Sequence, residues 1–404
     1  ALLCAASPDS SQPPPFMIAL RPASRHAAEP ARNRADRRDA PRRDAPPRDE
    51  APTSPSAGTF HYFCPCPRGL EAALADELRA LGAHDIDTRP GGVGCRGDLK
   101  LAYRINLEAR LPSRVLLRLL DAACRNEHTL YRLCNALAWE DWFDARQTIR
   151  VDVVAQRSPL RSLNFATLRI KDAIVDRFRD HGGERPSVDT HHPDVRISAF
   201  LTADRLQLYL DLSGEPLFKR GWRHSAENRV AAPLKENLAA GLLALSGWDA
   251  RQPLLDPFCG SGTLVIEAAQ ILCDHAPGLN RRFGIEQLRL HDAALYDGLV
   301  TALRERARQG IGKAPRGLIR ASDLDPHAMR LTAENLQTLG LPDDLVAMQT
   351  LDAVDAQPGG DTPGVLLANP PYNERVSIPV EHWRAIGATL RERALRGVEE
   401  TTFY

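Results

Sequence analysis

The sequence lacks an excess of charge of either sign, because its 52 basic and 52 acidic residues cancel over 404 positions. Net charge therefore does not point to a nucleic-acid partner, and any basic surface must be local. The chain also lacks an apolar run long enough to cross a bilayer, and residues 1–6 lack the basic and apolar segments of a secretion signal. We therefore expect no membrane association.

Cysteine is present without a pattern. The eight cysteines are irregularly spaced, which favours reduced thiols in a cytoplasmic protein over a disulfide framework. Neither Cys64-Pro65-Cys66 nor the pair His191-His192 has partners at the spacing of a zinc site. We expect no bound metal.

The first 58 residues are poor in apolar side chains and rich in Pro, Ala, Arg and Asp, with a mixed-charge centre at 32–50. Such a segment cannot bury enough apolar surface to offset the entropy of ordering its backbone. We predict a disordered tail over residues 1–58.

The first informative motif is a glycine loop that follows the short apolar run 253–255. It reads Asp256-Pro257-Phe258-Cys259-Gly260-Ser261-Gly262-Thr263. A buried strand that ends at an acid and a glycine turn is typical of the first βα turn of a doubly wound sheet, and residues 263–272 supply the helix. Small residues there let the backbone approach a ligand. The loop has neither the spacing of a dinucleotide fingerprint nor the lysine of a P-loop.

The second motif, Asn369-Pro370-Pro371-Tyr372, follows another apolar run at 364–368, so it should face the same sheet edge as the glycine loop. The side-chain oxygen of Asn369 and the carbonyl of Pro370 can each accept an N–H from a planar amine. Those bonds would direct the nitrogen lone pair at the methyl group of S-adenosylmethionine. Two prolines fix the backbone, and Tyr372 offers a face for the base. The pattern predicts catalysis by positioning.

Two acids between these motifs are candidates for holding a nucleoside cofactor. Residues 318–323 are predicted to form the second strand, and Asp323 at its tip could take the ribose hydroxyls, as the acid does in dinucleotide folds. Asp325 competes, but Pro326 favours a cap for the helix 326–339. Asp352, after a strand at 345–351, could accept from the adenine amine or could be an ordinary turn acid. We favour packing over nucleophilic chemistry for Cys259. The predicted cofactor set from these residues is Asp256, Pro257, Cys259, Gly260, Gly262, Thr263, Asp323 and Asp352.

These motifs, taken in order, resemble the THUMP-containing RNA guanine-N2 methyltransferases. The match is closest to the RlmL type, the amino-terminal half of a bifunctional enzyme. It extends through residues 68–71, 168–176, 210–214, 220–223 and 233–240, and covers about 60–395. The resemblance implies methyl transfer from S-adenosylmethionine to the N2 amine of a guanosine in large-subunit (23S) ribosomal RNA or its precursor particle. It also implies that Lys235 and Glu236 lie near the methionine moiety.

The resemblance divides the chain into an α+β module and a methyltransferase domain. We expect a small α+β domain at 59–100, a THUMP RNA-binding domain at 101–212 and a Rossmann-like class I methyltransferase domain at 213–404. Arg157, Arg161, Arg169 and Lys171 gather around a strand-to-helix connection, where they could neutralise RNA phosphates. Arg157, Arg161 and Lys171 are the predicted RNA contacts, and a solvated helix face is the alternative.

The sequence departs from the family pattern in two places. Asn373 stands where a glycine usually follows the tyrosine, and the chain ends after the fourth strand and a helix at 380–396. We therefore expect a truncated domain with an incomplete sheet and an uncovered edge on the fourth strand.

Two other functions remain open at this stage. A DNA amino-methyltransferase would share the Asn-Pro-Pro-Tyr motif, and the truncation raises a non-catalytic RNA-binding remnant. The THUMP-like region argues against the first.

Overall fold

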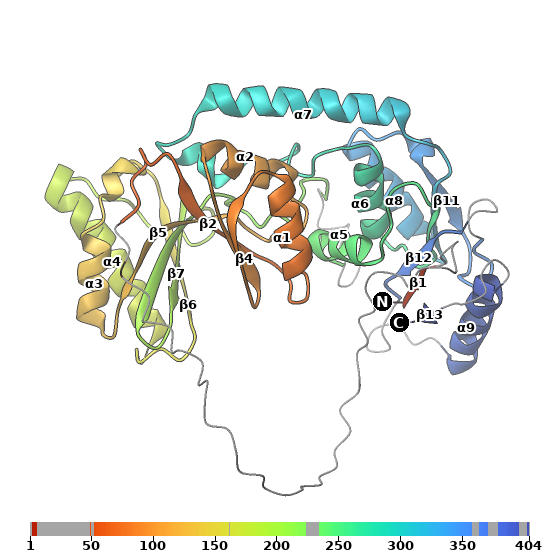
Figure 1. The fold of residues 1–404 in the computed structure, drawn as a ribbon, viewed down its shortest axis with the longest axis horizontal. Helices are drawn as coiled ribbons and strands as arrows, with labels where there is room; N and C mark the ends of the chain where they lie inside the picture. The colour runs from red at the N-terminus through yellow and green to blue at the C-terminus, as the bar shows by residue number, and fades with distance from the viewer. Residues whose placement is uncertain are drawn as a thin grey trace, which may run out of the picture.

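The computed structural model describes residues 2–5, 49, 52–160, 162–223, 234–357, 363–370, 379–395 and 402–403. Two sheets organise them, one in each half of the chain, and a long helix, α7 (Ala293–Lys313), lies across the top of both (Figure 1). Of the described helices, none is long and apolar enough to cross a membrane. Buried free thiols are found at Cys64, Cys66, Cys95, Cys124, Cys134, Cys259 and Cys273.

The first sheet has seven strands in the order β3-β4-β2-β5-β8-β7-β6. Only β6 and β7 pair in parallel; the other neighbours are antiparallel. The strands are β2 (Phe60–Pro65), β3 (His84–Arg89), β4 (Gly92–Gly97), β5 (Leu116–Ala123), β6 (Ile149–Ala155), β7 (Val195–Leu201) and β8 (Arg205–Asp211). The predicted hairpin of β7 and β8 is confirmed.

Alternation along β2 decides which face of this sheet is covered. Phe60, Tyr62 and Cys64 are buried in one core with residues of α1, whereas His61 and Phe63 point to the other face and are half-buried. The covering helices are α1 (Glu71–Ala80) and α2 (Leu99–Glu108), followed by α3 (Glu127–Asn135), the short η1 (Trp139–Asp141) and α4 (Leu163–Gly182). Among the described residues, α1 and α2 pack in the core on the side of Phe60, Tyr62 and Cys64.

The order β2-α1-β3-β4-α2-β5 forms one ferredoxin-like unit, and α2 crosses the boundary that we expected between residues 100 and 101. The Asp98 side chain caps this helix by accepting from the backbone N–H of Leu101. Because β5 then pairs with both β2 and β8, the same sheet continues into the following domain.

The second sheet contains the parallel strands β11 (Val346–Thr350), β10 (Ile319–Asp323), β9 (Leu254–Asp256) and β12 (Val365–Ala368), in that order. Successive strands add outward on one side of β9, and β12 lies on its other side, so the chain is doubly wound. The helices of this half include α5 (Glu236–Leu245), α6 (Thr263–Leu272), α8 (Pro326–Thr338) and α9 (Val380–Leu395), with the short η3 (Asp343–Leu345) before β11. The predicted strands and helices are confirmed within about two residues.

The outer edge of β12 is covered, so our expectation of an uncovered edge was wrong. β1 (Leu2–Ala5) pairs antiparallel with β12, and β13 (Thr402–Phe403) pairs with β1. An unpaired edge offers N–H and C=O groups to any extended segment, and here two segments of the same chain take them. The disorder expected over residues 1–58 has exceptions: β1, Asp49, which accepts from the N–H of Ala123, and residues 52–58, where Thr53 donates to backbone carbonyls of β5.

The long segment 273–318, between α6 and β10, connects the two halves of the molecule. It contains η2 (Gly284–Gln287) and α7, and its apolar residues Phe283, Ile285 and Leu303 belong to the core of the first half. The backbone N–H of Ile285 donates to Leu212 (2.9 Å). Sequence analysis assigned no structure to this segment, because its apolar residues pack on a distant sheet.

A buried ion cluster lies at the same junction. The Glu267 carboxylate on α6 is fully buried and pairs with Arg220 Nε at 3.0 Å and Arg110 Nη1 at 3.2 Å. Arg220 also donates to the carbonyl of Arg110. Burial lowers the pKa of Arg110, opposed by Glu267. The Glu267 carboxylate therefore connects α6, the helix that follows residues 256–262, to Arg110 of the first half and to Arg220, which precedes α5.

Two helix faces differ in detail from what the apolar pattern indicates. The buried face of α5 carries Ala239, Ala240 and Leu243, while Leu245 is 50% exposed. Small side chains let α5 pack closely on α6, which an apolar pattern of leucines does not reveal. On α4, the apolar Leu168 is 53% exposed. Trp222 lies in the core of the second half.

Candidate active site

The carboxyl edge of the second sheet gathers most of the predicted cofactor residues. Asp256 ends β9, and its Oδ1 accepts the N–H of Phe258 at 3.1 Å, which turns the chain into the glycine loop. The carboxyl is buried, and burial raises its pKa to about 7, with the neighbouring Asp323 adding to the rise and the Phe258 bond opposing it. The Asp256 side chain therefore fixes the turn from β9 into the glycine loop.

The glycine loop has a positive φ at two glycines, and at the second the surrounding space also requires glycine. Gly260 has φ +54° and Gly262 has φ +86°, and a Cβ on Gly262 would come within 2.6 Å of Thr332 Cγ2. Helix α8 holds the loop, since Thr332 Oγ1 donates to the Gly260 carbonyl and Asn335 Nδ2 to that of Ser261. Sequence reasoning missed Thr332 and Asn335, which sit on an ordinary amphipathic helix.

Asp323 lies at the tip of β10, directly beside this loop. Its Oδ2 accepts the N–H of Gly260 at 2.9 Å, and its Oδ1 accepts that of Asp325 at 3.0 Å. Each carboxylate oxygen keeps a second lone pair for a hydroxyl donor. The next residue, Leu324, is 63% exposed, an apolar surface that a nucleoside base would cover. These residues fit a nucleoside cofactor.

The competing acid, Asp325, caps α8 as predicted. Its side chain accepts the N–H of His327 at 2.8 Å, and Pro326 occupies the first turn. The interpretation of Cys259 as a packing residue also agrees with the structure: its Sγ lies 3.6 Å from the sulfur of Met329, and burial raises its thiol pKa well above the usual range. A thiol that resists ionisation is a poor nucleophile.

Asp352 lies on the loop after β11 and contacts α9. Its Oδ1 accepts the N–H of Val354, and its Oδ2 lies 3.2 Å from His382 Nε2. Beside it, Trp383 of α9 stacks on Phe258 of the glycine loop, with ring centroids 6.0 Å apart. Sequence reasoning missed Phe258, His382 and Trp383. The first turn of α9 is therefore tied to both the glycine loop and the β11 loop.

The predicted amine clamp is described in part. Asn369 follows β12 and is half-buried, and Pro370 is buried. Pro371, Tyr372 and Asn373 lie outside the described residues. Because β12 is adjacent and parallel to β9, Asn369 and Asp256 end neighbouring strands at one edge. The role of the motif stays a prediction.

Arg223 connects the start of the domain to the glycine loop. It donates from Nε to the buried Glu236 at 2.8 Å, and its other nitrogens donate to the hydroxyls of Ser261 and Thr263. Burial raises the pKa of Glu236, opposed by Arg223. Lys235 caps α5 without a side-chain bond, and its Nζ lies 5.1 Å from the ring centre of Phe218. Glu236 therefore supports the loop through Arg223, a residue that sequence reasoning left without a role.

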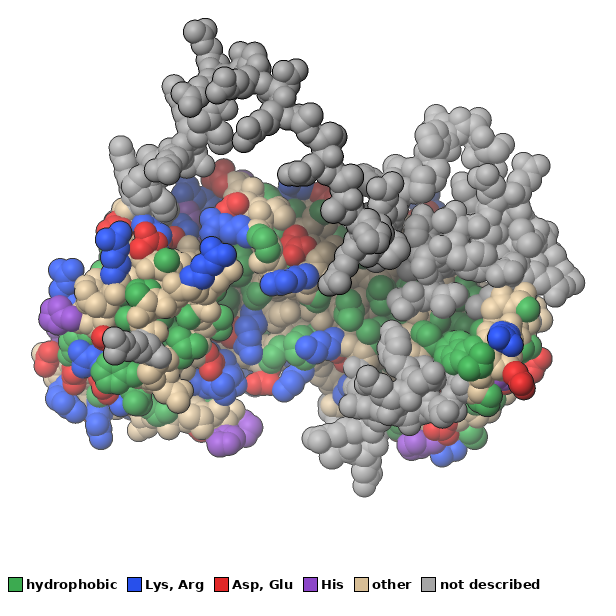
Figure 2. All heavy atoms as spheres, turned by 90° about the horizontal axis from the view of Figure 1, so that it is seen from below, with side chains coloured by type: hydrophobic (Ala, Val, Ile, Leu, Met, Phe, Trp, Pro, Cys, Tyr) green, Lys and Arg blue, Asp and Glu red, His purple; other side chains and the backbone are tan. Residues whose placement is uncertain are grey.

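The predicted RNA contacts lie at the end of β6 and on α4. Arg157 is exposed, whereas Lys171 pairs with Asp172 at 2.6 Å and Arg169 lies over Tyr131. Arg161 falls outside the described residues. Exposed apolar side chains, which sequence reasoning missed, accompany them; they are Val154, Leu163, Phe165 and Leu168. Figure 2 shows Lys and Arg side chains interspersed with Asp and Glu over this half of the molecule.

Three family models match consecutive parts of the chain. They are an RlmL ferredoxin-like domain over residues 61–116, a THUMP domain over 124–211 and an RMKL-like methyltransferase domain over 220–394. The first match takes in α2 and the start of β5, which explains why a boundary at residue 100 falls inside a helix.

Among curated proteins, the chain is 42% identical over 342 residues to a ribosomal RNA large subunit methyltransferase K/L of Syntrophotalea carbinolica, covering 82% of this chain and 47% of that protein. It is 40% identical to the protein of the same name from Shewanella amazonensis, covering 78% of this chain and 44% of the relative. The chain thus spans about half the length of the curated relatives it matches.

Solved structures agree in fold. A predicted N6-adenine-specific DNA methylase of Listeria monocytogenes superposes with a TM-score of 0.74 at 29% identity, over 83% of this chain and 86% of that one. SMU.472, a methyltransferase complexed with S-adenosylhomocysteine, gives 0.71 at 29% identity, over 83% and 87%. TrmN of Thermus thermophilus gives 0.57 at 22% identity, over 84% and 86%, and shows the fold alone.

A doubly wound domain with a glycine loop, joined to a ferredoxin-like unit and a THUMP domain, defines a THUMP-containing methyltransferase. Within that class, the RlmL-type first domain and the curated relatives show that the chain belongs to the ribosomal RNA large subunit methyltransferase K/L family. The methyl donor of this family is S-adenosylmethionine, as predicted.

Proposed function

We propose that this chain transfers the methyl group of S-adenosylmethionine to the N2 amine of a guanosine in 23S ribosomal RNA, in the cytoplasm. The observation that carries the proposal is the sharing of one sheet edge by Asp256, Asp323 and Asn369, in a domain bonded through a buried cluster to the ferredoxin-like unit, whose sheet continues into the THUMP domain. Cofactor, amine and RNA would then meet on one rigid body.

Each element of the site has a role in this proposal. Asp323 would bind the ribose hydroxyls of the cofactor. The backbone N–H groups of the glycine loop, together with Thr263, would bind its methionine end. Leu324 and Asp352 would contact the adenine. Asn369 and Pro370 would accept the N–H groups of guanine and orient its lone pair. The donor supplies an electrophilic methyl group, so the protein needs no acid for the leaving sulfide.

The chain would reach its substrate through the THUMP domain. Arg157, Arg161 and Lys171 would neutralise phosphates, and the exposed Phe165 and Leu168 of α4 would contact unpaired bases. Large-subunit RNA, naked or in a precursor particle, is the proposed partner because both named relatives act on it.

The test is a transfer assay on the 404-residue chain with methyl-labelled S-adenosylmethionine. Naked 23S RNA, large-subunit particles and duplex DNA are offered separately, and nucleosides are identified after digestion. We expect N2-methylguanosine from RNA. Methylated adenine in DNA would support the alternative that the name of the Listeria structure suggests. RNA binding without transfer to any substrate would support the non-catalytic remnant.

A further inference from the structure

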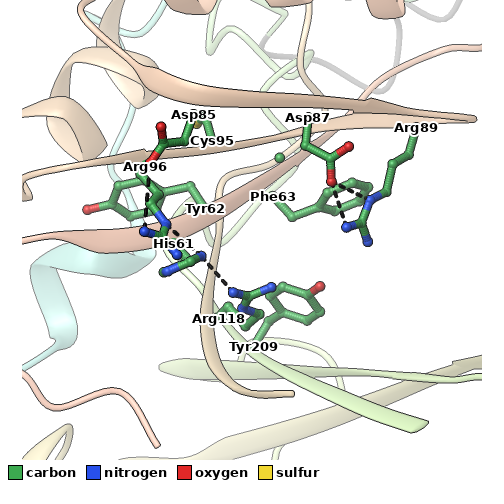
Figure 3. A pocket seen from close by; sticks show the side chains of 11 residues that line it. His61, Tyr62, Phe63, Asp85, Asp87, Arg89, Cys95, Arg96, Arg118 and Tyr209 are labelled. Atoms are coloured by element: carbon green, nitrogen blue, oxygen red, sulfur yellow. Dashed lines mark hydrogen bonds and ion pairs between the residues drawn. The ribbon is translucent and has the colours of Figure 1, made fainter. Parts of the chain in front are cut away.

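Charges of both signs line a groove of about 370 Å³ on the first sheet, whose wall includes Phe63 and Arg118 (Figure 3). Arg89 pairs there with Asp87 at 2.6 Å, and Arg118 lies 3.7 Å from Asp121. The arginines of the groove therefore have carboxylates close by. The contacts of α9 in the second half of the molecule indicate a more specific role.

A third apolar cluster, apart from the two main cores, joins α9 to the second sheet. Ile386 of α9 is buried in it, together with Ala353, which follows β11. The half-buried side chains of Phe258, Leu366 and Trp383 pack against these two residues. Phe258 belongs to the glycine loop, and Leu366 belongs to β12. One helix therefore packs against β12 and against the loops that follow β9 and β11.

Two consecutive residues in the first turn of α9 contact these two loops. His382 Nε2 lies 3.2 Å from Asp352 Oδ2, and the Trp383 ring stacks on Phe258 with 30° between the ring planes. Their backbone N–H groups both donate to the carbonyl of Pro379, which fixes the start of the helix. Because successive side chains of a helix diverge by about 100°, the pair can reach two different loops.

The contact with His382 restricts the carboxylate of Asp352. Oδ1 accepts the N–H of Val354 at 3.0 Å, while Oδ2 faces the imidazole. A partner at each oxygen sets the plane of the carboxylate before a ligand arrives. A carboxylate oxygen can accept two hydrogen bonds, so an adenine amine could join these partners. An acceptor that is already oriented loses less conformational entropy on binding than a freely rotating one.

We propose that the first turn of α9 positions the cofactor site. Through Asp352, His382 sets the selectivity for the exocyclic amine of adenine. Through Phe258, Trp383 holds the backbone of the glycine loop. The first role rests on the proposed contact between Asp352 and adenine. A 6-oxo purine presents an acceptor where adenine presents a donor, so a carboxylate held in place rejects it. His382 and Trp383 are positioning residues, since each acts through another side chain.

The role of His382 is tested by calorimetric titration of the 404-residue chain with two ligands. They are S-adenosylhomocysteine and S-inosylhomocysteine, which has an oxygen in place of the adenine amine. Wild type should bind the first at least about tenfold more tightly. His382→Ala should reduce this ratio at least about threefold, because the carboxylate of Asp352 is no longer held. His382→Gln, whose amide can replace the ring Nε2–H, should reduce the ratio less.

Trp383 is tested with the same two ligands. Trp383→Ala should weaken both by a similar factor, about three- to tenfold, because the glycine loop contacts parts of the cofactor that the two ligands share. Trp383→Phe keeps an aromatic ring on Phe258 and should stay within about twofold of wild type. Arg384→Ala, an exposed change on the same helix, is the control and should match wild type.

Each outcome decides one part of the proposal. An unchanged ratio in His382→Ala, or an equal loss for both ligands, would overturn the selectivity role, because a merely structural contribution affects both ligands alike. Wild-type affinity in Trp383→Ala would overturn the role of that residue. Both results would leave the proposed methyl transfer standing. No binding of S-adenosylhomocysteine by the wild-type chain would overturn the proposed function as well.

A second measurement needs no variant. Amide hydrogen exchange of the wild-type chain is followed with and without S-adenosylhomocysteine. Slower exchange over residues 380–389, together with residues 256–262, would support the positioning role of α9. Slower exchange at 256–262 with no change at 380–389 would overturn that role and leave the cofactor site in place.

Discussion

In the second half of the molecule, Asp256, Asp323 and Asn369 each stand where a parallel strand ends, and the loops between them carry the site. In the first half, Phe63 and Arg118 stand within antiparallel strands, and the groove between them is a sheet face. The functional residues of a loop at a strand end are neighbours in the sequence. The side chains that share a sheet face come from strands far apart in the sequence, so only the strand register shows that they lie together.

The two halves are nevertheless joined through one buried carboxylate, and the largest effect we expect comes from removing it. Glu267→Gln leaves Arg220 and Arg110 without their buried anion, which should cost about 3–5 kcal/mol. Urea unfolding followed by tryptophan fluorescence measures this. Glu305→Gln on exposed α7, which breaks the pair with Arg308, is the control and should cost under about 1 kcal/mol. An equal loss of unfolding free energy in Glu267→Gln and Glu305→Gln would show that the buried carboxylate does not stabilise the contact between the two halves.

The next largest effect concerns the candidate active site at the strand ends of the second sheet. Asn369→Ala should lower methyl transfer by at least about 100-fold, because one of the two acceptors that orient the amine is gone. Cofactor affinity should stay within a few-fold. Gln349→Ala, an exposed amide on β11, should leave transfer unchanged. A variant at Asn369 with near-normal turnover would rule out the clamp.

Cofactor binding separates the two acids on the β10 loop. Asp323→Ala should weaken S-adenosylmethionine binding about 10- to 100-fold by calorimetry, since hydrogen bonds to a charged group are lost. Asp325→Ser keeps the cap of α8 and should bind nearly as wild type. The reverse order of affinities would transfer the ribose role to Asp325.

The strands β9 and β12 were predictable because each is a short apolar run followed by a motif, the acid and glycine turn after β9 and the asparagine after β12. The structure of the segment 273–318, between α6 and β10, was not predictable, because Phe283 and Ile285 pack on the other half of the molecule. Nor was the buried face of α5, which is built from alanine. Arg223, which precedes α5, and Thr332 and Asn335, both on α8, support the glycine loop, and no spacing along the chain connects them to it.

The last effect concerns pH and the carboxyl of Asp256 at the start of the glycine loop. Burial raises the pKa of Asp256 to about 7, so the folded state holds its proton more tightly than the unfolded chain, whose carboxyl titrates near pH 4. The unfolded state therefore ionises first as pH rises. This group's contribution to stability is full below about pH 4 and is lost as pH rises to about 7, a loss of at most about 4 kcal/mol.

Asp256→Asn should remove that loss, and the difference from wild type is read from urea midpoints between pH 4 and 8. The amide can still accept the N–H of Phe258, so the turn is kept. Asp249→Asn is the matched control, because that exposed carboxylate accepts the N–H of Arg251 at 3.0 Å in the same local pattern. A pH dependence unchanged in Asp256→Asn would show that the carboxyl is ionised in the folded state. Its negative charge would then be available to the sulfonium of the cofactor.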